Sequence, residues 1–227
     1  LSKKTTGRNA TQQKIGDFFG ACMNESAVEK LGAAPLKPYL DQINGMKSKK
    51  DLPAVLASLH LKTQGSGFLF GFGSNQDFEN SQNIIAFATG GGLSLPDRDY
   101  YTKDDQRSVD LRKKYVDHVQ KMLVLLCDKT EVAQTEAAKI MELETSLAKA
   151  SLTRVEQRDP YKLFHKVDFR GLQVMTPSFD WATYIKGMGL PAQATFNVTQ
   201  PAFYAELEKQ LQSNSLDDIK TYLRWHL

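Results

Sequence analysis

The side chains that most often hold a catalytic metal are widely scattered in this sequence. Its four histidines are His60, His118, His165 and His226. A catalytic zinc site commonly uses two histidines four residues apart on one helix, because that spacing directs both imidazoles toward the same ion. Here the two closest histidines, His118 and His165, are 47 positions apart. We therefore expect this chain to contribute no catalytic, cofactor-binding or metal-binding residue, and to bind no zinc by itself.

Acidic side chains offer a second set of metal-binding groups. Glu136, Glu142 and Glu144 lie in a stretch with helical periodicity, but no histidine or aspartate cluster lies near them in the sequence. Such a group of acids usually forms a solvated helix face, and we expect that here. Two further acids suit surface ion pairs as well as metal coordination: Asp117 beside His118, and Asp168 near His165.

The densest group of special residues is a turn that follows a triple glycine, Gly90–Gly92. Glycine adopts backbone dihedrals that a Cβ forbids, so the chain can reverse sharply here. Pro96 fixes its own φ, and Asp97 or Asp99 can cap the helix that follows. Between these acids, Arg98 offers five donors in a planar fork. The group is either a structural corner or an arginine-based ligand site. We favour the corner, because a short motif without confirming context is weak evidence for binding.

The elements that position these residues are mostly helices. Apolar residues recur every three to four positions over most of the chain, which predicts a mainly α, multi-helix lobe. Near residues 67–88 the period changes to two, and this alternation predicts one β-hairpin inserted between the helices. The predicted helices cover residues 8–23, 35–45, 52–59, 105–128, 131–150 and 180–188. Three more helices are predicted to begin near Pro160, Pro201 and Ser215. Residues 24–32 are predicted to form a turn.

Two long helices are predicted to pair through apolar stripes. The stripe of residues 105–128 contains Leu111, Tyr115, Val119, Met122 and Leu126, and that of residues 131–150 contains Val132, Ile140, Leu143 and Leu147. The last helix carries Ile219, Tyr222 and Leu223 and reaches Leu227 without a stop signal. From this we expect the protein to continue beyond the sequence given.

Composition and charge are ordinary for a soluble globular protein. The 227 residues are 41% hydrophobic and 24% charged, and the formal net charge is +3. Lys47, Lys49 and Lys50 form a tight basic cluster that falls in a predicted loop, and we expect no nucleic-acid partner. We also expect no membrane span within the chain. Cys22 and Cys127 fall in apolar helical patterns, which predicts buried free thiols. The sequence alone does not decide whether they form a disulfide with each other.

Longer stretches of the sequence resemble a known family. The segment from Gly92 to Tyr101, Gly-Leu-Ser-Leu-Pro-Asp-Arg-Asp-Tyr-Tyr, is similar to a hallmark of the neprilysin family of zinc metallopeptidases. Residues 14–26 resemble that family's early helix and its Cys-x-Asn-Glu-Ser turn, and residues 144–161 resemble its long helix and the turn that follows. Residues 195–201 and 221–226 resemble later segments of the same region. The resemblance therefore covers nearly the whole chain, in order.

The resemblance implies a fragment of a larger enzyme. Residues 1–227 are expected to be the N-terminal helical, lid-like region of a neprilysin-like peptidase, which encloses the substrate cavity together with a catalytic domain outside this chain. The family's His-Glu-x-x-His helix and its later zinc-binding Glu are absent from this sequence. The implied function is proteolysis of peptides by a zinc metalloendopeptidase, in which zinc polarises the scissile carbonyl and a Glu serves as general base. The chain alone is expected to be inactive.

The resemblance also implies a setting and leaves an alternative open. The low cysteine content resembles bacterial members of the family, and the implied location is extracytoplasmic, either secreted or periplasmic. The implied partners are peptide substrates and the C-terminal catalytic domain. The alternative is a stand-alone helical binding module without catalytic activity, which the absence of a stop signal after Trp225 disfavours.

Overall fold

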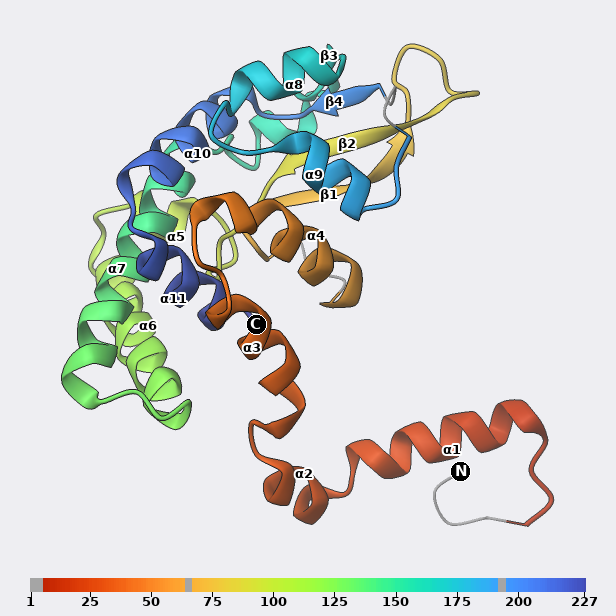
Figure 1. Cartoon of the computed structure of the whole chain (residues 1–227), viewed down its shortest axis with the longest axis vertical. Helices are drawn as coiled ribbons and strands as arrows, with labels where there is room; N and C mark the ends of the chain where they lie inside the picture. Colours follow the sequence, from red (N-terminus) through yellow and green to blue (C-terminus); the bar gives the residue numbers. More distant parts are fainter. Residues whose placement is uncertain (1–5, 64–66, 192–194) are drawn as a thin grey trace. The chain divides into compact units, whose positions relative to one another are not determined.

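The computed structural model describes residues 6–63, 67–191 and 195–227. The chain divides into two compact units, Leu1–Pro38 and Tyr39–Leu227. We describe each unit by itself (Figure 1).

The smaller unit is built from short capped helices. It contains α1 (Ala10–Cys22), α2 (Glu25–Leu31) and the 3-10 turn η1 (Ala34–Leu36). Asn9 and Gln12 form a reciprocal capping box at the start of α1. The turn predicted for residues 24–32 was wrong, because these residues form α2. Its first turn is stabilised by the Asn24 side chain, which accepts from the Ala27 amide at 3.2 Å, and by the acidic Glu25.

The apolar face of this unit is exposed. Ile15, Phe18 and Phe19 share a face of α1, but they are exposed by 48%, 75% and 46%. Cys22, on the same helix, is also exposed, and so is Cys127 in the larger unit. Both thiols are free, and the prediction that they are buried was wrong. Helical periodicity locates an apolar face, but it does not show what covers that face.

The larger unit holds the remaining elements, of which α3 begins at the boundary between the units. In chain order they are α3 (Lys37–Asn44), η2 (Lys49–Asp51), α4 (Leu52–Thr63), β1 (Phe70–Gln76), β2 (Ile84–Gly90), α5 (Asp99–Thr102), α6 (Gln106–Leu125), α7 (Thr130–Ala150), η3 (Glu156–Arg158), η4 (Pro160–Leu163), β3 (Lys166–Val167), α8 (Phe169–Met175), α9 (Trp181–Gly187), β4 (Phe196–Val198), α10 (Pro201–Ser213) and α11 (Leu216–His226). The mainly α fold is confirmed.

The predicted hairpin is present and belongs to a larger sheet. Strands β1 and β2 pair antiparallel, in a register that runs from Phe70 opposite Gly90 to Gln76 opposite Ile84. Two further short strands extend the sheet to the order β1-β2-β4-β3, with β4 parallel to β2 and β3 antiparallel to β4. These strands have three and two residues, too few to show a periodicity in the sequence.

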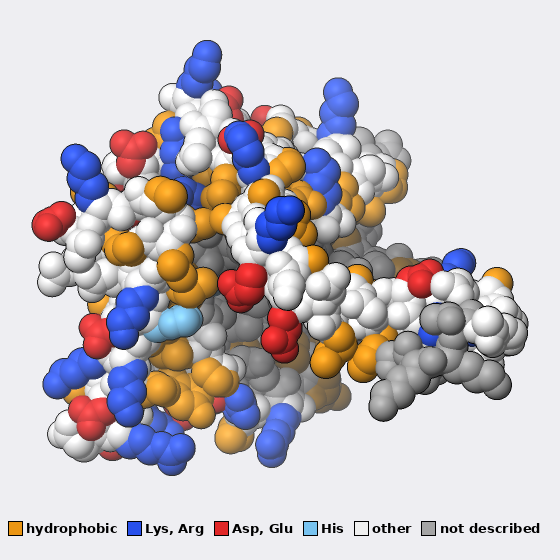
Figure 2. Space-filling view, turned by 90° about the horizontal axis from the view of Figure 1, so that it is seen from below, with side chains coloured by type: hydrophobic (Ala, Val, Ile, Leu, Met, Phe, Trp, Pro, Cys, Tyr) orange, Lys and Arg blue, Asp and Glu red, His pale blue; other side chains and the backbone are white. Residues whose placement is uncertain are grey.

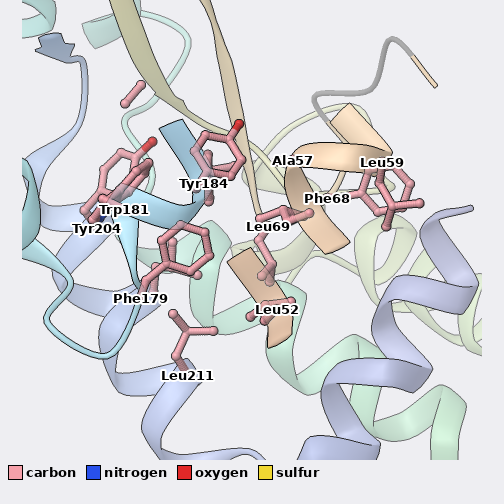
Figure 3. Packing of buried hydrophobic residues seen from close by; sticks show 14 of the residues in the cluster. Leu52, Ala57, Leu59, Phe68, Leu69, Phe179, Trp181, Tyr184, Tyr204 and Leu211 are labelled. Atoms are coloured by element: carbon pink, nitrogen blue, oxygen red, sulfur yellow. The ribbon is translucent and has the colours of Figure 1, made fainter. Parts of the chain in front are cut away.

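An aromatic core packs between the sheet and the helices α4, α9 and α10. Figure 3 shows side chains from these segments pointing toward one another. Phe70 lies at its centre, with ring centroids 5.2 Å from Trp181 and 5.4 Å from Tyr184. The one polar atom of the buried Trp181 side chain is satisfied, because its Nε1 donates to Thr176 Oγ1 at 2.6 Å. Aromatic side chains bury large areas, so this cluster fixes α9 against the sheet.

A second, smaller core joins α6 to α7, at the end of the unit away from the sheet (Figure 1). Tyr115 and Val119 are buried there, as predicted. The third buried residue of α6 is Leu123, whereas the predicted Met122 is 41% exposed and Val132 is 48% exposed. One position on a helix is a rotation of about 100°, so a stripe read from sequence can miss the contact line by one residue.

The segment between α7 and α9 differs most from the prediction. The helix predicted at Pro160 is only the 3-10 turn η4, which Asp159 caps by accepting from the Tyr161 amide at 3.0 Å. His165 lies just after this turn. The helix α8 was not predicted, and the Asp168 side chain caps it by accepting from the Gly171 amide at 2.7 Å.

Candidate functional site

The glycine turn after β2 is a tightly packed corner. Gly92 has φ near +70°, a conformation that side chains with a Cβ rarely adopt. A Cβ at this position would lie 2.5 Å from the Tyr222 hydroxyl and 2.8 Å from the Leu69 carbonyl oxygen. That hydroxyl donates to the Gly92 carbonyl at 2.9 Å and accepts from the Leu69 amide at 3.1 Å. The corner is therefore joined directly to α11.

Asp97 and Arg98, the candidate ligand-binding group of the turn, are bonded to the protein itself. Asp97 accepts from the Asp99 amide at 2.8 Å and pairs with Arg154 Nε at 2.7 Å. Arg98 Nε donates to the carbonyl of Ala148 at 3.1 Å, near the end of α7. These contacts fasten the turn to α7 and to the segment after it. They support the interpretation of the turn as a structural corner.

The solvated face predicted for the α7 acids was wrong for Glu144, whose side chain is fully buried. Its Oε1 accepts from Ser94 Oγ and contacts His226 Nε2, each at 2.8 Å. Its Oε2 accepts from the hydroxyls of Tyr101 at 2.8 Å and Tyr115 at 2.7 Å. Four neighbours therefore saturate one carboxylate, as a buried carboxylate requires. Glu136 is also partly covered, and Thr221 Oγ1 donates to it at 2.9 Å.

The Glu144 cluster, formed by Glu144 with Ser94, Tyr101, Tyr115 and His226, joins five segments. Its members come from the turn, α5, α6, α7 and α11, and Trp225 Nε1 extends it by donating to Ser94 Oγ at 2.8 Å. Burial, together with the negative charge of Glu144, raises the pKa of Tyr101 and Tyr115 well above the usual value. Both phenols therefore stay protonated and serve as donors. The arrangement fixes helices in place and offers no activated nucleophile.

The other histidines do not converge with acids. His60 is buried and contacts the Tyr184 hydroxyl at 2.7 Å and the Phe68 carbonyl at 3.1 Å. His165 Nδ1 contacts the Val198 carbonyl at 3.1 Å, and the His118 ring packs against Trp225. Within the described ranges, no three side chains of His, Cys, Asp or Glu gather closely enough to hold a metal ion. The residues of this chain that the structure describes therefore do not fit a catalytic zinc.

One groove of about 670 Å³ opens beside the hairpin. Its apolar wall includes Phe72, Ile85 and Leu190, and its polar end carries Asp77 and Lys166. Asp77 is buried, and its hydrogen bond from Lys166 Nζ, at 2.5 Å, holds its pKa below the usual range. The two charges neutralise each other, and the pair presents no nucleophile or general base to the groove.

Comparison with known proteins places the chain in a family. The model of the N-terminal region of peptidase family M13 matches residues 1–227. Endothelin-converting enzyme 1 of Rattus norvegicus is 24% identical over 237 residues, which span all of this chain and 31% of that protein. Neprilysin-3 of Drosophila melanogaster is 25% identical over 186 residues, covering 78% of this chain and 24% of the relative.

Solved structures agree with the sequence comparison. The inhibitor-bound zinc metalloprotease Zmp1 of Mycobacterium tuberculosis superposes with a TM-score of 0.87 at 27% identity, over 97% of this chain and 34% of that one. PepO of Lactobacillus rhamnosis shares the fold, with a TM-score of 0.76 at 13% identity. The chain spans about a third of the length of these relatives. No helix among the described residues is long and apolar enough to cross a membrane. The chain belongs to peptidase family M13, the family of neprilysin-like zinc metallopeptidases, and corresponds to its N-terminal region.

Proposed function

We propose that residues 1–227 are the N-terminal, lid-like part of a zinc-dependent metalloendopeptidase that hydrolyses peptides. The observation that carries this proposal is the family match over the whole chain. It is supported by the TM-score of 0.87, at 27% identity, to a zinc metalloprotease. In the proposed enzyme this chain forms one wall of a cavity that admits peptides, and the other wall is the catalytic domain. The same match favours a peptidase over a stand-alone binding module.

The proposal places the catalytic zinc outside this chain. The described part of the chain offers no convergent set of ligands, and its buried carboxylate, Glu144, is saturated by its four neighbours. The zinc would supply the Lewis acidity for peptide hydrolysis when bound by the catalytic domain. The contribution of residues 1–227 is then to exclude bulk water and folded proteins from the cavity and to restrict access to extended peptides.

The protein is proposed to come from a bacterium and to act outside the cytoplasm. Its proposed partners are peptides and the catalytic domain, and no nucleic acid. Relatives with 24% to 27% identity include both animal and mycobacterial peptidases, which is compatible with a bacterial source. The low net charge of +3 supports the exclusion of a nucleic-acid partner.

The test compares the full-length protein with the 227-residue chain. We expect the full-length protein to contain stoichiometric zinc and to hydrolyse a fluorogenic peptide until a chelator removes the metal. We expect no hydrolysis of the same peptide sequence when it lies within a folded protein domain. The chain alone should show neither zinc nor hydrolysis. Zinc-dependent hydrolysis by the chain alone would refute the placement of the catalytic site, and an inactive, zinc-free full-length protein would refute the peptidase assignment.

A further inference from the structure

A small pocket lies where the glycine turn, the end of α7 and the start of α10 meet. We call it the glycine-turn pocket, and its volume is about 270 Å³. Its walls include the turn from Gly90 to Leu93, Arg98, Leu152 just after α7, and Gln200 at the start of α10. The contacts that hold this corner together do not use all of its hydrogen-bond donors.

The Gln200 side chain directs a donor into this pocket, although the residue is only 8% exposed. Its Oε1 accepts from the Leu152 amide at 2.7 Å, and this bond fixes the orientation of the side-chain amide. Its Nε2 lies on the side of Gly90, 2.8 Å from the position that a Cβ on Gly90 would take. Nε2 donates to no residue that the structure describes. A buried side-chain donor without a protein acceptor is uncommon, and it points to a ligand or an ordered water.

Further donors line the same pocket. Arg98 uses its Nε for the Ala148 carbonyl, and its two terminal nitrogens donate to no described residue. The backbone amides of Gly91 and Gly92 likewise have no acceptor among the described residues. Because glycine has no Cβ, a ligand can approach the backbone closely at these two positions. The pocket is therefore rich in donors that the protein itself leaves unused.

The residues that line the pocket carry one net positive charge. Arg98 and Arg154 are its cations, and Asp97 is its acid. Asp97 already accepts from the Asp99 amide at 2.8 Å and pairs with Arg154 Nε at 2.7 Å. The charge of Arg98 is therefore left over. Gln200 is the N-cap of α10, so the positive end of that helix's dipole adds to the attraction for an anion.

We propose that the glycine-turn pocket binds the carboxylate of a small ligand from solution. One net positive charge matches a monoanion, and the guanidinium of Arg98 and the amide of Gln200 offer the donors that a carboxylate accepts. Pockets for drug-sized ligands have volumes of about 300–1,000 Å³, so this smaller one fits a ligand of about one amino acid. Binding would use the donors left over by the structural contacts, and the proposal does not depend on peptidase activity.

The test uses the full-length protein and N-acetylglycine, with the uncharged N-acetylglycinamide as the matched ligand. Calorimetry measures binding, and thermal unfolding measures the stabilisation that binding produces. We expect saturable binding of N-acetylglycine and binding of the amide that is weaker by about tenfold or more, because the amide carries no negative charge. Equal affinity for the two ligands, or no binding of either, would overturn the proposal.

Gln200→Glu supplies a carboxylate from the protein itself. Glutamate keeps an oxygen for the Leu152 amide and replaces the unused Nε2 with an anionic oxygen. We expect this variant to be at least as stable as the parent and to bind N-acetylglycine about tenfold more weakly, because its own carboxylate engages the donors of the pocket. Undiminished binding would place the ligand elsewhere. A variant less stable than the parent would show that the pocket does not accept a carboxylate, and either result would overturn the proposal.

Gln134→Glu is the matched control. Gln134 is exposed near the start of α7, whereas the pocket lies beyond the end of that helix. Figure 2 shows Lys and Arg side chains spread over another part of the surface, so general attraction of an anion must be separated from binding in the pocket. The control changes the net charge by the same amount and should leave binding and stability unchanged. If it weakens binding as much as Gln200→Glu does, net charge is responsible and the pocket is not the site.

Discussion

Glu144 on α7 and His226 on α11 lie in direct contact, with Oε1 and Nε2 2.8 Å apart, although 82 positions separate them in the chain. The side chain of Glu144 is fully buried, and that of His226 is only 5% exposed. The pair therefore joins the final helix to the centre of the fold. A buried carboxylate is costly unless its acceptor sites are filled, so α11 and the glycine turn stabilise each other through this one group.

We predict that Glu144→Gln lowers the free energy of unfolding by about 3 kcal/mol, because an amide nitrogen then faces hydroxyl and imidazole donors that need an acceptor. Chemical unfolding of the full-length protein, followed by tryptophan fluorescence, measures the change. Glu142→Gln is the matched control, since that side chain lies on the same helix and is 71% exposed. An equal effect of both substitutions would contradict the role assigned to the Glu144 cluster.

The sequence predicted elements whose signals are local. Pro201 opens α10, and Ser215 caps α11 by accepting from the Asp218 amide at 3.0 Å, both as expected. Glu144 could have been predicted as buried, because it lies four residues after Ile140 and three before Leu147, on the same apolar face. The four neighbours that make its burial tolerable come from distant segments, and nothing in the local sequence indicates that they converge.

We predict that Gly92→Ala destabilises the protein by about 2–4 kcal/mol. The new methyl group requires an unfavourable φ and overlaps the Tyr222 hydroxyl and the Leu69 carbonyl. Gly73→Ala is the control, because a Cβ on Gly73 meets no atom within 4 Å. The same unfolding experiment should show a change of less than about 1 kcal/mol for the control. A Gly92→Ala protein as stable as the parent would show that the backbone around residue 92 accommodates the added methyl group without cost.

We predict that Asp97→Ala or Arg98→Ala lowers stability by about 1–3 kcal/mol through loss of the turn contacts. Asp97 accepts a hydrogen bond from the Asp99 amide and forms a salt bridge with Arg154. Arg98 donates a hydrogen bond to the Ala148 carbonyl. Thermal unfolding and peptide hydrolysis should be measured on the same full-length variants. The control is Asp104→Ala, at a side chain that is 99% exposed. A variant at Asp97 or Arg98 that melts like the parent yet loses activity would restore the ligand-binding interpretation.

We predict that stability falls as the pH is lowered from about 6.5 to about 4, and that His60 contributes to this fall. Burial lowers the pKa of His60 from 6.5 to about 4. Below pH 6.5 the unfolded chain therefore binds a proton that the folded chain excludes, and this favours unfolding by up to about 3 kcal/mol near pH 4. Urea unfolding of the parent and of His60→Gln at several pH values tests the idea. The variant should lose less stability over this range, and parallel pH profiles would contradict the prediction.

We predict that the 227-residue chain, when produced alone, self-associates through its first two helices. Six large hydrophobic side chains of this unit are exposed: Ile15, Phe18, Phe19, Met23, Val28 and Leu31. Exposed apolar side chains promote association in water, and the driving force is proportional to the apolar area that association buries.

Light scattering over a range of protein concentrations measures this association. Phe18→Ser with Leu31→Ser should shift the chain toward the monomer, because these side chains are 75% and 56% exposed. Val155→Ser is the control, since Val155 is also 75% exposed but lies in the larger unit. If the double variant and the control associate as strongly as the parent, the surface responsible lies elsewhere. A parent chain that stays monomeric at high concentration would show that its exposed apolar residues do not drive association at all.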